Sequence, residues 1–229
     1  MLIRQFARHE HAIREVSFIP HVTHSADGSC VIKSGNTHIL CTACLSVNST
    51  GLHVEFGQLP GSEHPRVSRD AVRNSFETGN IENIVHQSLS LMLDADVLKK
   101  VGLHIDCDVL QSEGSIKSAC VSGAYVAMAF ALKKWTGSAL FPKLPVISQV
   151  AGISCGLIKG RMVLDLDHQE AMQADVVGDF VFSSDNQVVN IDVKAKQYAV
   201  PFEQIRDMEH MAVRGVAQIL SAQKKCLNG

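Results

Sequence analysis

The sequence predicts an α+β fold, with mostly antiparallel and mixed sheets and helices packed against them. The first observation is the order of the patterns, which is strands, helix, strand, helix, strands and a last helix. The second is the composition: 229 residues with 46% apolar and 19% charged residues supply an ample core and exclude extended disorder. The third is that neighbouring β-rich runs are joined by short turn segments, which favours hairpins over parallel crossovers.

The first elements are strands. Short β-rich runs between residues 16 and 56 predict an antiparallel meander. Two of these runs flank Gly35 and Asn36, a pair that takes positive φ at low cost and suits a two-residue hairpin turn. Residues 60–79 then break any hydrophobic period with Pro, Gly and Arg, so we expect a loop there.

Two helices and a strand follow. A helix is expected over about residues 80–98, because apolar residues recur at helical spacing and Asn80 stands where an N-cap is expected. Residues 103–110 alternate between apolar and polar and predict a strand. The segment 116–133 is apolar on nearly every side, so this helix is expected to lie buried between layers.

The second half of the chain repeats the strand and turn pattern. Four strands are expected, at residues 150–158, 161–167, 175–183 and 187–195. A closing amphipathic helix is expected from residue 202 to about residue 223. We predict a single domain over residues 1–229, with residues 135–145 as the best candidate for an internal linker because they contain Gly and Pro.

Charge and hydropathy limit the partners and the location. The 21 basic and 23 acidic side chains nearly cancel, so any nucleic-acid role must rest on a local basic surface. The longest apolar run, residues 121–132, is shorter than the roughly 18 to 20 residues that a membrane span needs. The N-terminus has no apolar signal region. We therefore expect a cytoplasmic protein without a membrane segment.

The cysteines and histidines form no convincing metal or disulfide framework. Seven cysteines, an odd number, are scattered and lie mostly inside apolar segments, which is typical of buried free thiols. Cys41 and Cys44 have the spacing of half a zinc site or of a redox pair, but residues three apart on a strand point to opposite faces. We interpret both as ordinary core cysteines.

Two pairs of carboxylates lie on predicted strands, Asp106 with Asp108 and Asp165 with Asp167. Alternation places the members of each pair on one face, roughly 6 to 7 Å apart. That spacing suits a shared divalent ion, and it is equally the ordinary pattern of a strand that faces solvent. Further acids follow the second pair, so a rim rich in carboxylates is expected near one sheet.

The turn between a predicted strand and the apolar helix carries a more informative pattern. Here Gly114 precedes two hydroxyls, from Ser115 and Ser118, and the ammonium of Lys117. Together with free N–H groups at a helix start, these groups suit a bound phosphate. A helix N-cap built on Ser115 explains the serine equally well but leaves the lysine unexplained.

Arginines are spaced along the loop between residues 60 and 79, at Arg66, Arg69 and Arg73. Guanidinium groups at such intervals can grip the phosphate backbone of a polynucleotide. A charged loop is also commonly just solvated. Neither the loop nor the glycine and serine turn identifies the protein by itself.

The order of four segments does identify a family, since residues 26–43, 54–60, 106–114 and 163–167 closely resemble ribonuclease PH. The likeness covers nearly the whole chain, which is identified as a divergent member. It implies the ribonuclease PH-like α+β fold and a homo-oligomer, namely a hexameric ring of dimers. It also implies phosphorolytic 3′→5′ exoribonuclease (tRNA nucleotidyltransferase) activity, with Mg²⁺ and with inorganic phosphate as co-substrate, on the 3′ ends of tRNA precursors.

The resemblance weakens at the expected phosphate contacts. The family motif Gly-Gly-Thr-Arg-Thr corresponds to residues 114–118, where Lys117 keeps a positive charge but lacks the bidentate fork of arginine. The family motif Gly-Arg-Thr corresponds to residues 76–78, which places Glu77 where a cation is expected. The phosphate-binding residues implied are therefore Gly114 and Ser115, with Lys117 and Ser118, at reduced affinity.

The acidic motif of the family is also altered in this chain. Its two catalytic and metal-binding aspartates align with Ala171 and Val177. Asp175 and Asp179 are the remaining candidates for an acid, and the metal ligands are unknown.

Arg66 and Arg69 match arginines that the family offers to RNA. The substitutions at the phosphate contacts and in the acidic motif predict an RNA-processing protein whose activity is weak or lost. The alternatives are an active phosphorolytic enzyme with rearranged acids, or a non-catalytic RNA-binding or scaffold subunit of a ring.

Overall fold

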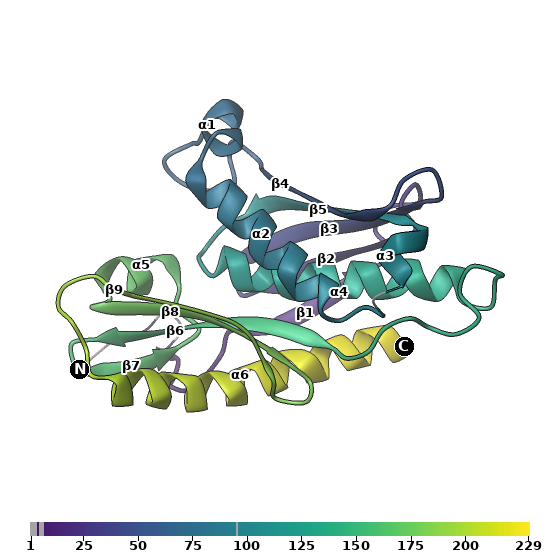
Figure 1. The fold of residues 1–229 in the computed structure, drawn as a ribbon. Helices are drawn as coiled ribbons and strands as arrows, with labels where there is room; N and C mark the ends of the chain where they lie inside the picture. The colour runs from purple at the N-terminus through teal and green to yellow at the C-terminus, as the bar shows by residue number, and fades with distance from the viewer. Residues whose placement is uncertain (1–3, 5–6, 95) are drawn as a thin grey trace.

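The α+β class is confirmed by a computed structural model, which describes residue 4, residues 7–94 and residues 96–229. The chain forms two sheets with helices packed on both and a helix between them (Figure 1). The strand order is β1-β2-β3-β5-β4 in the five-stranded sheet and β7-β6-β8-β9 in the four-stranded sheet.

The first half of the chain builds the five-stranded sheet. Its strands are β1 (Val16–Pro20), β2 (Gly28–Ser34), β3 (Thr37–Ser46), β4 (Gly51–Gln58) and β5 (Gly102–Gln111). Its helices are α1 (Arg69–Arg73), α2 (Phe76–Ser90), α3 (Val97–Lys100) and α4 (Ile116–Trp135).

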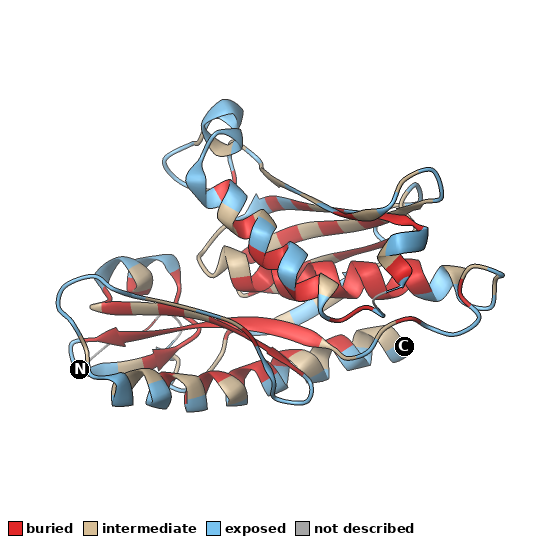
Figure 2. Cartoon of the chain, in the orientation of Figure 1, coloured by how far each residue is buried: buried red, intermediate tan, exposed pale blue. Residues whose placement is uncertain are grey.

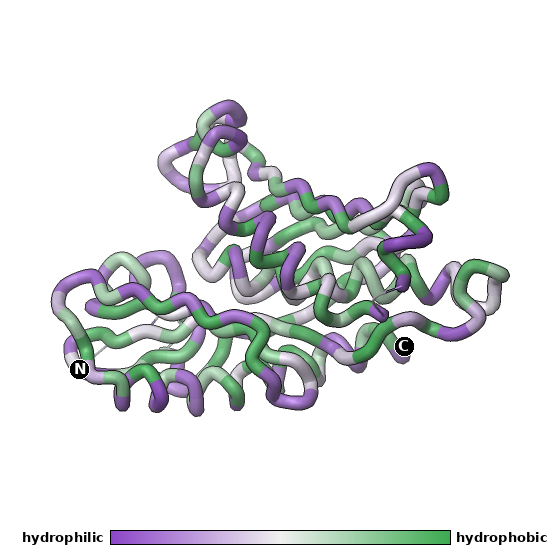
Figure 3. The backbone as a smooth tube through the Cα atoms, in the orientation of Figure 1, coloured by the Kyte–Doolittle hydropathy of each residue, from purple (hydrophilic) through white to green (hydrophobic). Residues whose placement is uncertain are grey.

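The second half builds the four-stranded sheet. Its strands are β6 (Val150–Ile158), β7 (Arg161–Leu164), β8 (Val176–Ser183) and β9 (Val188–Ala195). Its helices are α5 (His168–Gln173) and α6 (Phe202–Asn228). Helix α6 covers one face of this sheet and carries its hydrophilic residues on the side away from it (Figure 3).

The pairing of the first sheet is partly as predicted. The β2–β3 hairpin is confirmed, since Ser34 pairs with Thr37 across a turn in which Gly35 has a φ of +56°. The antiparallel meander is wrong for the fourth strand, because β4 runs parallel to β5 from Gly51 to Gln58. A parallel pair needs a long crossover, and α1, α2 and α3 supply it.

Helix α4 lies between the layers, as its apolar sequence predicts. It packs against β2 and β3 of one sheet and β6 of the other, and residues 118–132 are all buried (Figure 2). Within the described residues, α4 is the helix long and apolar enough to span a membrane by length and composition, but 83% of its apolar 18-residue window is buried inside the protein. Gly28 lets β2 approach α4 closely, since a Cβ at this position would clash with the carbonyl oxygen of Ala127.

The helix predicted over about residues 80–98 has the wrong bounds at both ends, since α2 ends at Ser90 and α3 is a separate helix. Helix α2 begins at Phe76, not after Asn80, and the expected loop over residues 60–79 also contains α1. The hydroxyl of Ser75 accepts a hydrogen bond from the amide of Thr78 and caps α2. The error arose because Phe76 is exposed, so the buried apolar period becomes visible only one turn later.

The strand predicted over residues 161–167 is too long. It ends at Leu164, because Asp165 has a φ of +55°, which an extended strand does not accommodate. Asp167 then caps α5 through a capping box with Glu170.

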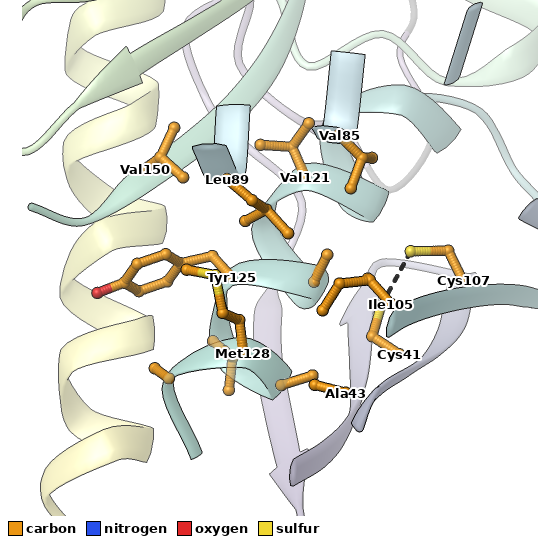
Figure 4. Close-up of a cluster of buried hydrophobic side chains, with 14 of the residues drawn as sticks. Cys41, Ala43, Val85, Leu89, Ile105, Cys107, Val121, Tyr125, Met128 and Val150 are labelled. Carbon is orange, nitrogen blue, oxygen red and sulfur yellow. Dashed lines mark hydrogen bonds between the residues drawn. The ribbon is translucent and has the colours of Figure 1, made fainter. Parts of the chain in front are cut away.

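Most cysteines line the core, as predicted. Cys41 and Cys107 face each other on neighbouring strands, with their sulfur atoms 3.9 Å apart (Figure 4). All seven cysteines are free, and Cys44 and Cys226 are the two that are only partly buried, so the interpretation of Cys44 as a core cysteine is wrong.

Candidate functional site

A cavity of about 620 Å³ opens where the two sheets meet the N-terminus of α4. Helix α2 contributes Glu77, the turn before α4 contributes Gly114 and Ser115, and β8 and β9 contribute Asp179 and Asp192. Residues far apart in the sequence therefore share one hollow. It contains most of the turn that the sequence singles out as a phosphate site.

The turn before α4 has an unusual backbone. Gly114 and Ser115 both have positive φ, at +112° and +56°. The Ser115 hydroxyl makes no capping hydrogen bond. Instead it lies 2.6 Å from the Ser154 hydroxyl and donates to the Leu166 carbonyl at 2.9 Å. This network ties the left-handed turn to β6, and it uses a hydroxyl that the sequence assigns to phosphate.

Lys117 is surrounded by carboxylates. Its Nζ lies 3.2 Å from Glu77, 3.6 Å from Asp179 and 3.5 Å from Asp192. The side chain is only 11% exposed. Burial opposes its charge, but the three acids outweigh burial and raise the pKa of Lys117 above its ordinary value. The ammonium therefore stays charged and is already paired.

Asp179 lies in the same cluster on β8. Burial raises the pKa of this carboxyl, and the charges of Asp192 and Glu77 add to the effect while Lys117 opposes it. The protonated form of Asp179 is therefore more favoured here than that of an aspartate in water. Asp179 is thus the candidate acid that the fold places in the cavity.

The other predicted residues lie elsewhere. Ser118 lines a small interior cavity of about 20 Å³ beneath α4, and its hydroxyl has no hydrogen-bond partner in the described part of the chain. Asp175 holds the β6–β7 turn, where its Oδ2 accepts from the amide of Lys159 at 3.0 Å. The cavity wall instead carries Ala171 and Val177, the positions where the family resemblance implies aspartates.

The second predicted carboxylate pair is neither solvent-facing nor a metal site. Asp165 and Asp167 are both buried, and the rim of acids expected there is neutralised by arginines of the N-terminal segment. Arg14 binds Asp165 at 2.6 Å, and Arg4 binds Glu170 at 2.6 Å. Local alternation missed this because the strand ends before both aspartates and their partners lie about 150 residues away.

The Mg²⁺ implied by the resemblance does not fit the cavity. Across the described residues, no group of three or more His, Cys, Asp or Glu side chains is arranged to hold a metal ion. The acids of the cavity converge on the Lys117 ammonium, which would repel a dication at their centre.

The arginines of the loop occupy a second hollow and its surroundings. A groove of about 600 Å³ is lined by Arg69 and Arg73 together with four acids, namely Glu55, Glu82, Asp106 and Asp108. Arg66 is exposed on the preceding loop. Burial and the neighbouring Asp106 raise the pKa of Asp108, while Arg69 opposes them. This groove therefore mixes both signs of charge.

Sequence reasoning missed two members of the cavity, Asp192 and Ser154. Neither belongs to a local motif, and each enters the site through strand pairing. Asp192 lies opposite Asp179 in the β8–β9 register, and Ser154 lies opposite Asp179 in the β6–β8 register. Alternation within a strand indicates which side chains share a face, but it does not reveal which strand lies next to it.

Comparisons with known proteins agree with this architecture. The chain matches the family model "3' exoribonuclease family, domain 1" over residues 12–133 and "domain 2" of the same family over residues 148–215. The two matches flank the predicted linker at residues 135–145.

Individual relatives show the same likeness. Ribonuclease PH from strains of Cereibacter sphaeroides is 31% identical over 226 residues, which cover 94% of this chain and 95% of the relative. The crystal structure of rice (Oryza sativa) Rrp46 has the same fold, with a TM-score of 0.79 and 15% identity over 99% of this chain and 100% of that chain. The chain therefore belongs to the ribonuclease PH family of 3′ exoribonucleases.

Proposed function

We propose that this protein binds the 3′ ends of RNA, with tRNA precursors as the substrate class, and has weak or no phosphorolytic activity. The observation that carries the proposal is the set of contacts around Lys117. The one lysine of the expected phosphate turn is paired with Glu77, Asp179 and Asp192, so an incoming phosphate meets three carboxylates. We further propose a cytoplasmic homo-oligomer, a hexameric ring of dimers, in which this chain acts as a binding or scaffold subunit.

The energetic reason is electrostatic. Phosphoryl chemistry depends on cations aimed at the developing negative charge. Glu77 reverses the sign of one expected contact, and Ala171 and Val177 remove two expected carboxylates. Each such change costs several kcal/mol of transition-state stabilisation, or roughly a thousandfold in rate.

The test is a phosphorolysis assay. Purified protein is incubated with a tRNA precursor, Mg²⁺ and inorganic phosphate, and release of nucleoside diphosphates is measured beside ribonuclease PH from Cereibacter sphaeroides. We expect release at least roughly a thousandfold slower than that of the relative. Phosphate-dependent release at a comparable rate would overturn the proposal.

A charge-restoring variant sharpens the assay. Glu77→Arg removes one carboxylate from Lys117 and supplies the missing cation, and it is combined with Ala171→Asp and Val177→Asp. We expect this triple variant to gain phosphate-dependent activity. The matched control Glu77→Gln with the same two aspartates removes the repulsion without adding a cation and should gain less.

One observation favours the alternative, an active enzyme with rearranged acids. Asp179 is half-buried in the cavity and its pKa is raised, which are properties of a general acid. If the wild-type protein is active, Asp179→Asn should abolish the activity. Asp175→Asn is the matched control, because Asp175 holds a turn outside the cavity.

A further inference from the structure

Phe76 is the most exposed large apolar side chain in the described part of the protein, at 87%. It is the first residue of α2. The cap formed by Ser75 fixes its position, since the Ser75 hydroxyl accepts from the amide of Thr78 at 3.0 Å. Thr78 is buried and its hydroxyl donates to the carbonyl of Val72. The ring is therefore displayed by an anchored helix end.

The residues around Phe76 separate the two hollows. Glu77, on one side, lines the cavity that contains Lys117. Ser75 and Thr78, on the other side, line the groove that contains Arg69. Phe76 thus stands on the ridge between the candidate 3′-end site and the arginine-bearing groove. Helix α1 and the adjoining end of α2 lie at the edge of the molecule (Figure 1).

Three arginines in the segment before Phe76 are available to bind phosphate groups. Arg66, Arg69 and Arg73 are all exposed, and none of them makes an ion pair with the residues that the structure describes. Lys117, by contrast, is fully engaged. These three guanidinium groups supply positive charge beside Phe76, on a side where the groove also carries four carboxylates.

Phe76 is the exposed aromatic ring at this ridge, and the exposed Met172 lines the neighbouring cavity together with Glu77. Between residues 60 and 90, Phe76 is the only exposed large apolar side chain. Protein interfaces are built around contiguous apolar patches. An exposed aromatic ring flanked by arginines and hydroxyls matches the surfaces that bind single-stranded nucleic acid, in which bases stack on aromatic side chains and cations bind the backbone phosphates.

We propose that Phe76 is a base-stacking residue for single-stranded RNA. The inference rests on the proposed RNA-binding function and adds a contact to it. The backbone phosphates lie along the arginines of the α1 segment, and one base stacks on the Phe76 ring at the entrance to the Lys117 cavity. Because every base has an aromatic face, this contact gives affinity with little sequence preference.

The test measures the affinity for a fluorescein-labelled oligoadenylate by fluorescence anisotropy. We expect Phe76→Ala to weaken binding roughly 5- to 100-fold, as expected for losing one base–aromatic stack, and Phe76→Trp to retain it. Phe202→Ala is the matched control. Phe202 is also the first residue of a helix and is 68% exposed, but it lies at the start of α6, on the opposite side of the molecule from α1 (Figure 1). The Phe202→Ala protein should bind the oligoadenylate as tightly as the wild type does.

An oligomer of the same length with one abasic site tests stacking directly. The abasic site is first moved along the oligomer to find the position at which it weakens binding most. With the abasic site at that position, Phe76→Ala should weaken binding little further. Equal loss on intact and abasic RNA at every position would overturn stacking. A change of molecular mass in light scattering, with RNA affinity unchanged, would assign Phe76 to a protein interface instead.

A second pair of substitutions separates this inference from the proposed function. Arg66→Ala with Arg69→Ala should lower affinity and flatten its dependence on salt. If wild-type protein binds no RNA, both proposals fail. If the arginine variant behaves as expected and Phe76→Ala binds like wild type, only the stacking inference fails.

Discussion

Asp165 illustrates how a single buried charge is tolerated. Burial opposes its ionisation, but Arg14 binds it through two side-chain nitrogens and its own backbone amide, at 2.6 to 2.9 Å. These contacts outweigh burial and hold the pKa of Asp165 below its ordinary value of 3.8. Glu170 follows the same pattern: burial opposes ionisation, but Arg4 lowers its pKa.

This arrangement predicts acid sensitivity. Because both folded-state pKa values are lowered, the stabilisation is complete above the unfolded-state values and is lost as pH falls through the folded-state values. We expect the free energy of unfolding, measured with urea, to decrease as pH falls below 4.5, the ordinary pKa of glutamate.

The variant Asp165→Asn tests the same contact. It leaves Arg14 buried without its partner, so we expect a loss of about 3 to 5 kcal/mol at neutral pH and a weaker acid dependence. The exposed Asp185→Asn serves as control. An acid dependence equal to that of the wild type would show that the pair does not drive the effect.

At the scale of elements, the start of α2 depends on its cap. Ser75 caps this helix, which buries residues such as Ile81 and Leu89 in the core. Ser68 makes the same hydrogen bond at α1, to the amide of Ala71, but α1 has no buried residue. The same cap therefore supports very different amounts of packing in the two helices.

The two caps give a matched pair of variants. We expect Ser75→Ala to lower the free energy of unfolding by about 1 kcal/mol, because the amide of Thr78 loses its partner at a helix that belongs to the core. Ser68→Ala should change it by less than about 0.5 kcal/mol, because α1 can fray without exposing the core. Urea unfolding followed by circular dichroism measures both. Equal losses would contradict this account.

At the scale of the whole molecule, α4 and α6 join the two sheets. Helix α6 packs mainly on the four-stranded sheet, while its last turns reach the core of the first. Gln223 marks this junction. It is fully buried and donates to the carbonyl of Ser122 on α4 at 2.9 Å and to that of Val150 on β6 at 3.0 Å.

Gln223→Leu should therefore destabilise the protein as a unit. The substitution removes both buried hydrogen bonds, for which we expect a loss of about 1 to 3 kcal/mol in urea unfolding. Gln218→Leu is the control, because Gln218 is exposed on the same helix. A Gln223→Leu protein as stable as this control would show that the junction contributes nothing.

The family and most elements could be predicted because they depend on local patterns. The apolarity of residues 116–133 indicates burial of α4 whatever surrounds it, and alternation indicates β5 in the same way. The start of α2 could not be predicted, because Phe76 is exposed and the first turn of the helix therefore lacks the helical spacing of buried apolar residues.

The sequence by itself determined the ribonuclease PH family, the α+β class and the buried helix. Only the tertiary structure decided that Lys117 pairs with acids from α2, β8 and β9, and that Asp165 is neutralised by Arg14. The physical reason is range. Hydropathy and turn propensity act between neighbours along the chain, whereas the state of a charge depends on which distant side chains the fold brings within a few ångströms of it.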